Sequence, residues 1–306
     1  MEKEPLKVYC RTCHTKLDIT ELPAFSYFDC PECGTAIRVP EQFGRYLLEK
    51  ICATACDAVV YRAIDRKLAR RVTIRILLPE YAGTRDFYNT ARLAAQIEHP
   101  AIVPILDCGI IDGRPYMATK LMERGNLEQM KNRGELPAVP VLATWLHAIT
   151  SALAAAAEQS IVHHCVTPEN MLVSAENEAM LGGFENADVR EYGEEDLPCP
   201  AGIPPAYASP ERLSTGGEDT RGDIFSLGVS MYELFAGELP FDSFAPAEEH
   251  YRLRQAMAFE PLKNKVPGIP DYFSALVNTM LAFDGDHRPD YPLILTALER
   301  LSRERI

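Results

Sequence analysis

The sequence predicts an α+β protein in which a β-rich lobe and a helical lobe follow a small cysteine-containing unit. Two Cys-x2-Cys pairs lie close together near the N-terminus. Residues 44–121 then alternate mostly as strands do, with a single helical stretch, whereas the residues beyond 122 have mainly helical spacing. We therefore expect three parts: a small unit over 1–43, a β-rich lobe over 44–121 and a helical lobe over 122–306.

The composition is that of an ordinary globular protein. Of the 306 residues, 47% are hydrophobic and 25% are charged, and 31 Lys and Arg against 44 Asp and Glu give a net charge of −13. Such a chain repels phosphate at long range, which disfavours general binding to nucleic acid or to an anionic membrane. The N-terminus lacks the basic start and apolar stretch of a secretory signal. We expect a soluble, cytoplasmic protein.

The most apolar window of the chain, 141–157, is rich in alanine and contains Thr144, His147, Thr150 and Ser151. A membrane span needs ~20 strongly apolar residues. We therefore interpret this window as a buried helix of the helical lobe.

The cysteine pairs predict a zinc ribbon. Cys10 and Cys13 are separated from Cys30 and Cys33 by 16 residues, a spacing that lets four thiolates surround one tetrahedral Zn²⁺. Four unrelated cysteines are the alternative, and His14 is a competing ligand. The zinc is expected to be structural, because so small a unit has little core of its own and no open coordination position is evident.

Zinc ribbons often bind nucleic acid, so the charge of this unit matters. Residues 1–44 hold five Lys and Arg against seven Asp and Glu. A surface that reads phosphate has the opposite bias. We therefore expect the ribbon to stabilise the protein or to dock a protein partner.

The elements of the β-rich lobe follow from the spacing of its apolar residues. Strands are predicted within 45–78, with a polar turn at 65–71, and a helix over 84–98 ends before Pro100. Two more strands are predicted over 103–106 and 116–121.

Several local strings, taken in order, resemble a bacterial-type Ser/Thr protein kinase domain over about residues 44–300. The strings are IEHPAIVPILDCGIIDGRPYMATKLMERGNL (97–127), IVHHCVTPENMLV (161–173), LGGFENAD (181–188), AYASPERL (206–213), RGDIFSLGVSMYELFAGELPF (221–241) and DGDHRPD (284–290). The resemblance implies a two-lobed kinase-like fold.

The chain departs from the family where the nucleotide would bind. Active kinases use glycines in the phosphate loop so that backbone amides can approach the phosphates. Here Ala53, Ala55 and Ala58 occupy the three glycine places. Arg75 replaces the strand-three lysine, a substitution that is not conservative, and Thr90 stands where the partner glutamate of that lysine is expected.

The catalytic loop departs in the same way. By the resemblance, Cys165 replaces the aspartate that accepts the substrate proton, and Thr167 replaces the phosphate-contacting lysine. Gly183 replaces the metal-binding aspartate, and of these groups only Asn170, a metal ligand in active relatives, is kept. One neutral amide cannot hold Mg²⁺ against water, and Glu185 is one position out of place.

The residues that are kept have scaffold roles in the family. His163 and Phe184 match an apolar stack, and Asp223 matches a buried carboxylate that accepts N–H bonds from the catalytic loop. Glu211 and Arg288 match a buried ion pair. The retained residues thus hold the fold, whereas the lost ones perform the chemistry.

The activation segment, about residues 183–211, has no Ser or Thr between Glu185 and Tyr207. His164 stands at the arginine that would receive a phosphate, and Pro204 stands at the usual threonine. We interpret the segment as a fixed or partner-binding loop, with a plain solvated loop as the alternative.

Taken together, these features predict a catalytically inactive kinase-like protein, a pseudokinase, that binds no ATP or Mg²⁺ and acts as a scaffolding or regulatory module in signalling. The resemblance to this family implies that the protein partner is an active kinase or its substrate. One alternative is a metal-independent nucleotide sensor or weak residual kinase that uses Arg75 and the hinge near 120–121. Another is nucleic-acid binding through a ribbon patch around Arg11 and Lys16.

Overall fold

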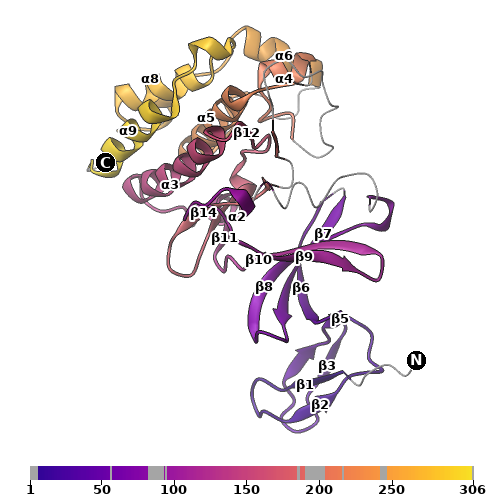
Figure 1. Cartoon of the computed structure of the whole chain (residues 1–306). Coiled ribbons are helices and arrows are strands. Elements are labelled where there is room, and N and C mark those ends of the chain that lie inside the picture. The colour runs from indigo at the N-terminus through magenta and orange to yellow at the C-terminus, as the bar shows by residue number, and fades with distance from the viewer. Residues whose placement is uncertain are drawn as a thin grey trace. The chain divides into compact units, whose positions relative to one another are not determined.

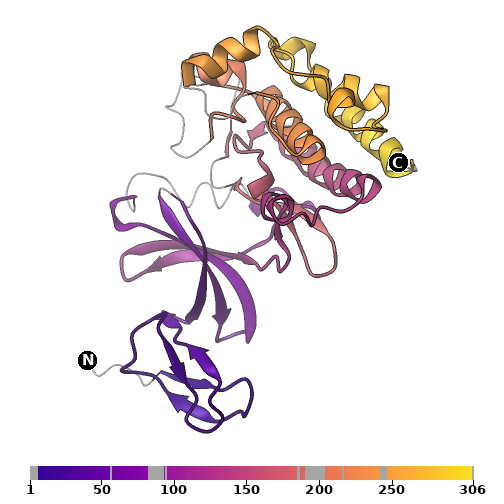
Figure 2. The same cartoon turned by 180° about the vertical axis from the view of Figure 1, so that it is seen from behind.

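The computed structural model describes residues 6–55, 57–81, 93, 95–184, 187–189, 204–215, 217–241 and 247–304. The chain divides into two compact units. The first contains Met1–Asp86 and Ile105–Leu121, and the second contains Phe87–Pro104 and Met122–Ile306. Figures 1 and 2 show strands throughout the first unit and mostly helices in the second, which confirms the predicted α+β class.

The cysteine-containing region of the first unit consists of two β-hairpins. The strands are β1 (Lys7–Tyr9) with β2 (Lys16–Asp18), and β3 (Tyr27–Asp29) with β4 (Ala36–Arg38). Their central residues alternate inward as short amphipathic strands do, and they pack with Ile19 and Val39 in a small core. Each hairpin turn carries one cysteine pair.

The rest of the first unit is a six-stranded antiparallel sheet in the order β5-β6-β7-β8-β10-β9. Its strands are β5 (Glu41–Phe43), β6 (Tyr46–Thr54), β7 (Ala58–Asp65), β8 (Arg70–Leu77), β9 (Ile105–Ile111) and β10 (Arg114–Lys120), and the short helix η1 (Pro79–Tyr81) follows β8. The core of the sheet includes Tyr46, Leu48 and Ile74, which are fully buried. The predicted polar turn at 65–71 joins β7 to β8. In this turn Asp65 Oδ1 accepts hydrogen bonds from Lys67 N and Leu68 N.

The strand predicted over 103–106 was only partly right. The chain pairs in the sheet over Ile105–Ile111, so residues 103 and 104 fall outside the strand. Pro104 has no N–H to donate and restricts the residue before it. Val103 N instead donates to Leu181 O in the second unit at 2.9 Å, so this stretch belongs to a different part of the fold.

The second unit is helical with short strands. Its helices are α2 (Leu127–Asn132), α3 (Val139–Ala157), α4 (Pro210–Thr215), α5 (Thr220–Ala236), α6 (Ala247–Gln255), α7 (Leu262–Lys265), α8 (Asp271–Met280), α9 (Tyr291–Ser302), and the short turns η2 (Pro168–Asn170) and η4 (Gly285–His287). Its strands are β11 (Gly125–Asn126), β12 (Ile161–Val162), β13 (Met171–Val173), β14 (Ala179–Leu181) and β15 (Asp188–Val189). Helix α5 is buried continuously from Gly222 to Leu234 and forms the centre of the unit.

Helix α3 corresponds to the apolar window of the sequence. By length and composition it is apolar enough to cross a membrane, but half of that stretch is buried inside the second unit. Leu146, Ile149 and Leu153 are buried, and the helix packs against α9 and β14. It is thus the predicted core helix. The other predicted helix, 84–98, falls mostly outside the described residues, although Leu93, Ala95 and Gln96 are helical.

Candidate functional site

The four predicted zinc-ligating cysteines meet between the two hairpin turns. Their sulfurs all lie within 4.8 Å of one another. The Sγ atoms of Cys10 and Cys33 are 3.6 Å apart, as are those of Cys13 and Cys30. Ligands ~2.3 Å from a zinc ion in a regular tetrahedron are ~3.8 Å apart. The spacing therefore fits one tetrahedral ion.

The two turns that hold the cysteines share one backbone design. Cys10 N donates to Thr15 O and Cys30 N donates to Thr35 O, both at 2.9 Å. His14 and Gly34 occupy equivalent positions with φ of 58° and 69°. His14 is therefore the backbone counterpart of Gly34 in its turn.

The thiols differ in pKa, and therefore in how readily they lose the proton that metal binding displaces. Hydrogen bonds to Thr15 lower the pKa of Cys13 to about 6, and backbone N–H groups lower the pKa of Cys10. Burial raises the pKa of Cys30 to about 11. Because zinc binds the thiolate, these shifts bring Cys10 and Cys13 closer to the form that binds the ion and take Cys30 further from it.

The cysteine unit is attached to the six-stranded sheet by side chains. Arg11 Nη2 donates to Glu49 Oε1 on β6 at 2.7 Å. The ring of Phe25 stacks on that of Tyr61 on β7, with centroids 6.0 Å apart and an interplanar angle of 15°. The hairpins and the sheet thus form continuous structure within the first unit.

The three alanines of the predicted phosphate loop lie at the end of β6, at the start of β7 and between the two strands. Ala53 is exposed in β6, and Ala58 is the buried first residue of β7. Ala55 N donates to Ala58 O at 2.8 Å, which links the residue after β6 to the first residue of β7.

Arg75, which aligns with the strand-three lysine of the kinase family, forms an ion pair inside the first unit. Arg75 Nη2 on β8 donates to Asp57 Oδ1, directly before β7, at 2.7 Å. Both side chains are mostly buried, with 17% and 9% exposed. The guanidinium is therefore directed to a carboxylate at the edge of the first unit's sheet, just before β7.

In the second unit the loop after β12 is held by Asp223 of α5. The Asp223 carboxylate accepts hydrogen bonds from His163 N at 2.7 Å and from His164 N at 2.9 Å. The next residue, Cys165, is buried, and its N donates to His163 Nδ1 at 3.2 Å. Thr167 is also buried. The loop is thus fixed from inside the protein.

Asn170 and Gly183 are in close contact. Gly183 has φ of 86°, and a Cβ placed on it would lie 2.5 Å from Asn170 Cγ. The Asn170 amide Nδ2 donates to Cys165 O at 2.8 Å. The amide of Asn170 therefore occupies the space that a side chain at position 183 would need.

A charged cluster surrounds His164, which is buried. Its Nε2 lies 2.7 Å from Asp188 Oδ1 and its Nδ1 lies 2.9 Å from Glu218 Oε1, the oxygen that also accepts from Arg212 at 2.5 Å. Burial alone lowers the pKa of His164, but its hydrogen bonds to Asp188 and Glu218 outweigh this effect and raise the pKa to about 9. Burial and the charge of Glu218 raise the pKa of Asp223 to about 7.

The structure brings the remaining predicted residues together in pairs. His163 and Phe184 meet edge to face, with ring centroids 4.6 Å apart. Arg288 donates to both oxygens of Glu211, at 2.6 and 2.8 Å. The Arg288 guanidinium also lies over the ring of Phe225 at 5.1 Å.

A second buried arginine anchors the segment before α4. Arg254 on α6 is fully buried and donates to the carbonyls of Pro205, Ala206 and Ala208 at 2.8 to 2.9 Å. Its guanidinium lies 5.4 and 5.0 Å from the ring centroids of Phe225 and Phe241. Burial lowers its pKa to about 10.

Comparison with known proteins matches these features to one family. Residues 56–298 match the protein kinase domain. The chain belongs to the protein kinase family. It is 31% identical over 247 residues to the serine/threonine-protein kinase PknL of Mycobacterium tuberculosis, an alignment that covers 76% of the chain and 59% of PknL. It is also 29% identical over 272 residues to the DNA damage-responsive serine/threonine-protein kinase RqkA of Deinococcus radiodurans, covering 85% and 40%.

A third relative is the serine/threonine-protein kinase pkn2 of Myxococcus xanthus, 29% identical over 262 residues, which cover 80% of the chain and 31% of pkn2. The chain thus spans about three fifths or less of the length of these kinases. The similarity therefore concerns the kinase domain.

Within the kinase fold, the predicted site residues divide between the two units. Ala53, Ala55, Ala58 and Arg75 lie in the first unit, and the loop residues around Asn170 lie in the second. Thr90 lies outside the described residues, as does Glu185.

Sequence reasoning missed four charged residues of this kinase-family protein. Asp188, Arg212 and Glu218 complete the cluster around His164. Arg254 is the largest fully buried side chain among the described residues. The only signal in the sequence was the polar pair His250 and Arg254, which lie four residues apart and so share one helix face.

Proposed function

We propose that this protein is a catalytically inactive member of the protein kinase family, a pseudokinase that serves as a protein-binding regulatory module. The contact between Asn170 and Gly183 carries the proposal. Mg²⁺ sites for phosphoryl transfer use carboxylates together with substrate phosphates. Here the carboxylate position is a glycine, and the Asn170 amide fills the adjacent space while donating to Cys165 O.

The first unit supports the same proposal. In active kinases the strand-three lysine contacts the α- and β-phosphates. Arg75 is engaged by Asp57 instead, and a phosphate at Arg75 would have to compete with that carboxylate. The alanines at 53, 55 and 58 add methyl groups where the family needs close backbone approach.

The proton acceptor is also altered. Cys165 stands at the position of the catalytic aspartate and is 7% exposed. A cysteine thiol ordinarily keeps its proton at neutral pH, whereas an aspartate is already a carboxylate, so a thiol is the poorer acceptor for the proton of a hydroxyl. Loss of several cooperating groups removes most of the positioning and electrostatic stabilisation on which phosphoryl transfer depends.

We propose a structural zinc ion for the four cysteines. The fit of the sulfur positions to a tetrahedron and the packing of the hairpins against the sheet support this role. The ribbon would stabilise the first unit, and the partner of the whole module would be a protein, either an active kinase or its substrate.

Nucleotide binding provides the test. Zinc-loaded protein is titrated with ATP and with ADP, with and without Mg²⁺, by calorimetry and thermal shift, beside the PknL kinase domain as a positive control. A ligand that binds only the native state raises the melting temperature. We expect no shift at millimolar nucleotide and no phosphate transfer to a generic substrate protein.

A shift that requires Mg²⁺ would contradict the proposal. A shift without Mg²⁺ that Arg75→Ala abolishes would identify the protein as a metal-independent nucleotide sensor instead.

A further inference from the structure

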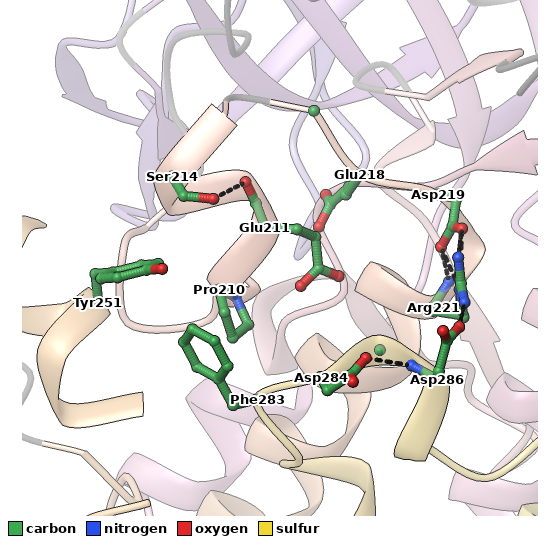
Figure 3. Close-up of a pocket in the computed structure, with 12 residues that line it drawn as sticks. Pro210, Glu211, Ser214, Glu218, Asp219, Arg221, Tyr251, Phe283, Asp284 and Asp286 are labelled. Carbon is green, nitrogen blue, oxygen red and sulfur yellow. Dashed lines mark hydrogen bonds and ion pairs between the residues drawn. The ribbon is translucent and has the colours of Figure 1, made fainter. Parts of the chain in front are cut away.

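A cavity of about 550 Å³ lies in the second unit between α4, the start of α5, α6 and the loop that contains η4. Its size is within the range of ~300–1,000 Å³ that is typical of ligand clefts. Figure 3 shows that its walls differ in chemistry. Of the residues that line this cavity, the site described above includes only Glu211, which pairs with Arg288, and Glu218, which pairs with Arg212.

One wall of the cavity is aromatic. The rings of Tyr251 and Phe283 meet edge to face with centroids 5.5 Å apart, and both residues are half-buried. Pro210 adds a third apolar surface beside them. Such a wall attracts a flat cation, which binds the faces of aromatic rings.

The opposite wall is acidic. The side chains that line the cavity include five carboxylates and one guanidinium, Arg221. Asp219 and Asp286 share Arg221. Asp284 accepts a hydrogen bond from Asp286 N at 3.0 Å, and His287 Nδ1 lies 3.7 Å from Asp284 Oδ2. Carboxylates at the mouth therefore outnumber the cations that pair with them.

We propose that this cavity docks an arginine-bearing segment of a basic protein partner. A guanidinium is planar and forked, so it can stack on Tyr251 or Phe283 while it donates to Asp284. The net charge of −13 favours a basic partner at long range. The protein already uses this chemistry in Arg288, which bonds Glu211 and lies over Phe225. The proposal deepens the function proposed above by giving the binding module a docking surface.

The test uses the full zinc-loaded chain and a fluorescein-labelled peptide of alternating alanine and arginine, measured by anisotropy in low salt. The same peptide with citrulline in place of arginine keeps the shape without the charge. We expect saturable binding of the arginine peptide alone, weakened by added salt because the interaction is electrostatic.

Two variants locate the binding. Asp284→Asn with Asp286→Asn removes two charges and retains the oxygen that accepts from Asp286 N, and we expect about tenfold weaker binding, since each hydrogen bond to a charged group contributes at least that much. The control, Asp271→Asn with Glu299→Gln, removes two exposed charges from α8 and α9. We expect it to change the affinity less than twofold, and Tyr251→Ala to weaken binding while leaving the charge intact.

Equal weakening by both double variants would mean general attraction to an acidic protein and would overturn the proposal. So would undiminished binding of the citrulline peptide, or the absence of arginine-peptide binding at millimolar concentration. Because no nucleotide is present, these outcomes do not depend on whether the protein is a pseudokinase.

Discussion

The Arg75 guanidinium lies 2.7 Å from the Asp57 carboxylate, and this pair joins β8 to the turn before β7. By the resemblance, position 75 corresponds to the lysine that contacts the nucleotide phosphates in active kinases. In this protein its guanidinium is paired with the carboxylate of Asp57. A largely buried ion pair of this kind is costly to break from one side, because the remaining charge keeps its desolvation cost.

The first prediction concerns this pair. In a double-mutant cycle of Asp57→Asn and Arg75→Gln, we expect a coupling of about 1–3 kcal/mol in the free energy of unfolding, measured by urea denaturation. The exposed pair Glu299 and Arg303, 2.5 Å apart on α9, is the control and should couple by less than ~1 kcal/mol. Equal coupling in the two cycles would refute a structural role for Arg75.

The second prediction concerns Gly183. Gly183→Ala should destabilise the protein by about 1–3 kcal/mol from backbone strain alone and by more from its contact with Asn170. Gly113→Ala is a matched control, because Gly113 has φ of 74° and no atom within 4 Å of its added Cβ.

Adding Asn170→Ala should relieve part of the Gly183→Ala loss, which denaturation of the single and double variants would reveal as non-additivity. Strict additivity would mean that Asn170 does not fill the space beside Gly183.

The third prediction is a pH dependence. The pKa of His164 rises from its ordinary value near 6.5 to about 9 on folding. The charged imidazole therefore contributes to the free energy of unfolding in full below pH 6.5, and this contribution is lost as the pH rises through 9. Asp188, Glu218 and Asp223 favour the charge, and Arg212, 2.7 Å from Nδ1, opposes it. Wild type should therefore lose up to ~3 kcal/mol of stability between pH 6.5 and 9.5 relative to His164→Gln. Parallel stability curves would contradict this.

The fourth prediction concerns the metal. The purified chain should contain one zinc ion, and Cys30→Ser should lose it, whereas Cys52→Ser, which changes an exposed cysteine of β6, should keep it. Because Phe25 stacks on Tyr61, removal of zinc should also lower amide-exchange protection in β6 and β7. Unchanged protection in the zinc-free protein would show that the hairpins and the sheet are energetically independent.

The sequence predicted much of this fold because local patterns and ordered motifs specify it. The strands of the sheet, the core helix α3 and the cysteine cluster all follow from short-range spacing. The start of the strand predicted at 103–106 was wrong because the apolar pattern cannot show that Val103 joins the second unit. The side chains that contact His164 were missed because Arg212, Glu218 and Asp188 converge only through tertiary structure. Charged residues in a sequence ordinarily indicate the protein surface.

Arg254 gives the segment before α4 an unusual kind of attachment. Its partners are two phenylalanine rings and four carbonyls, those of Pro205, Ala206, Ala208 and His250, none of which gains or loses a proton. A segment held by an attached phosphate responds to kinases, phosphatases and ionic strength. Residues 205–208 are held without any such reversible group, so neither a phosphatase nor added salt should release this attachment.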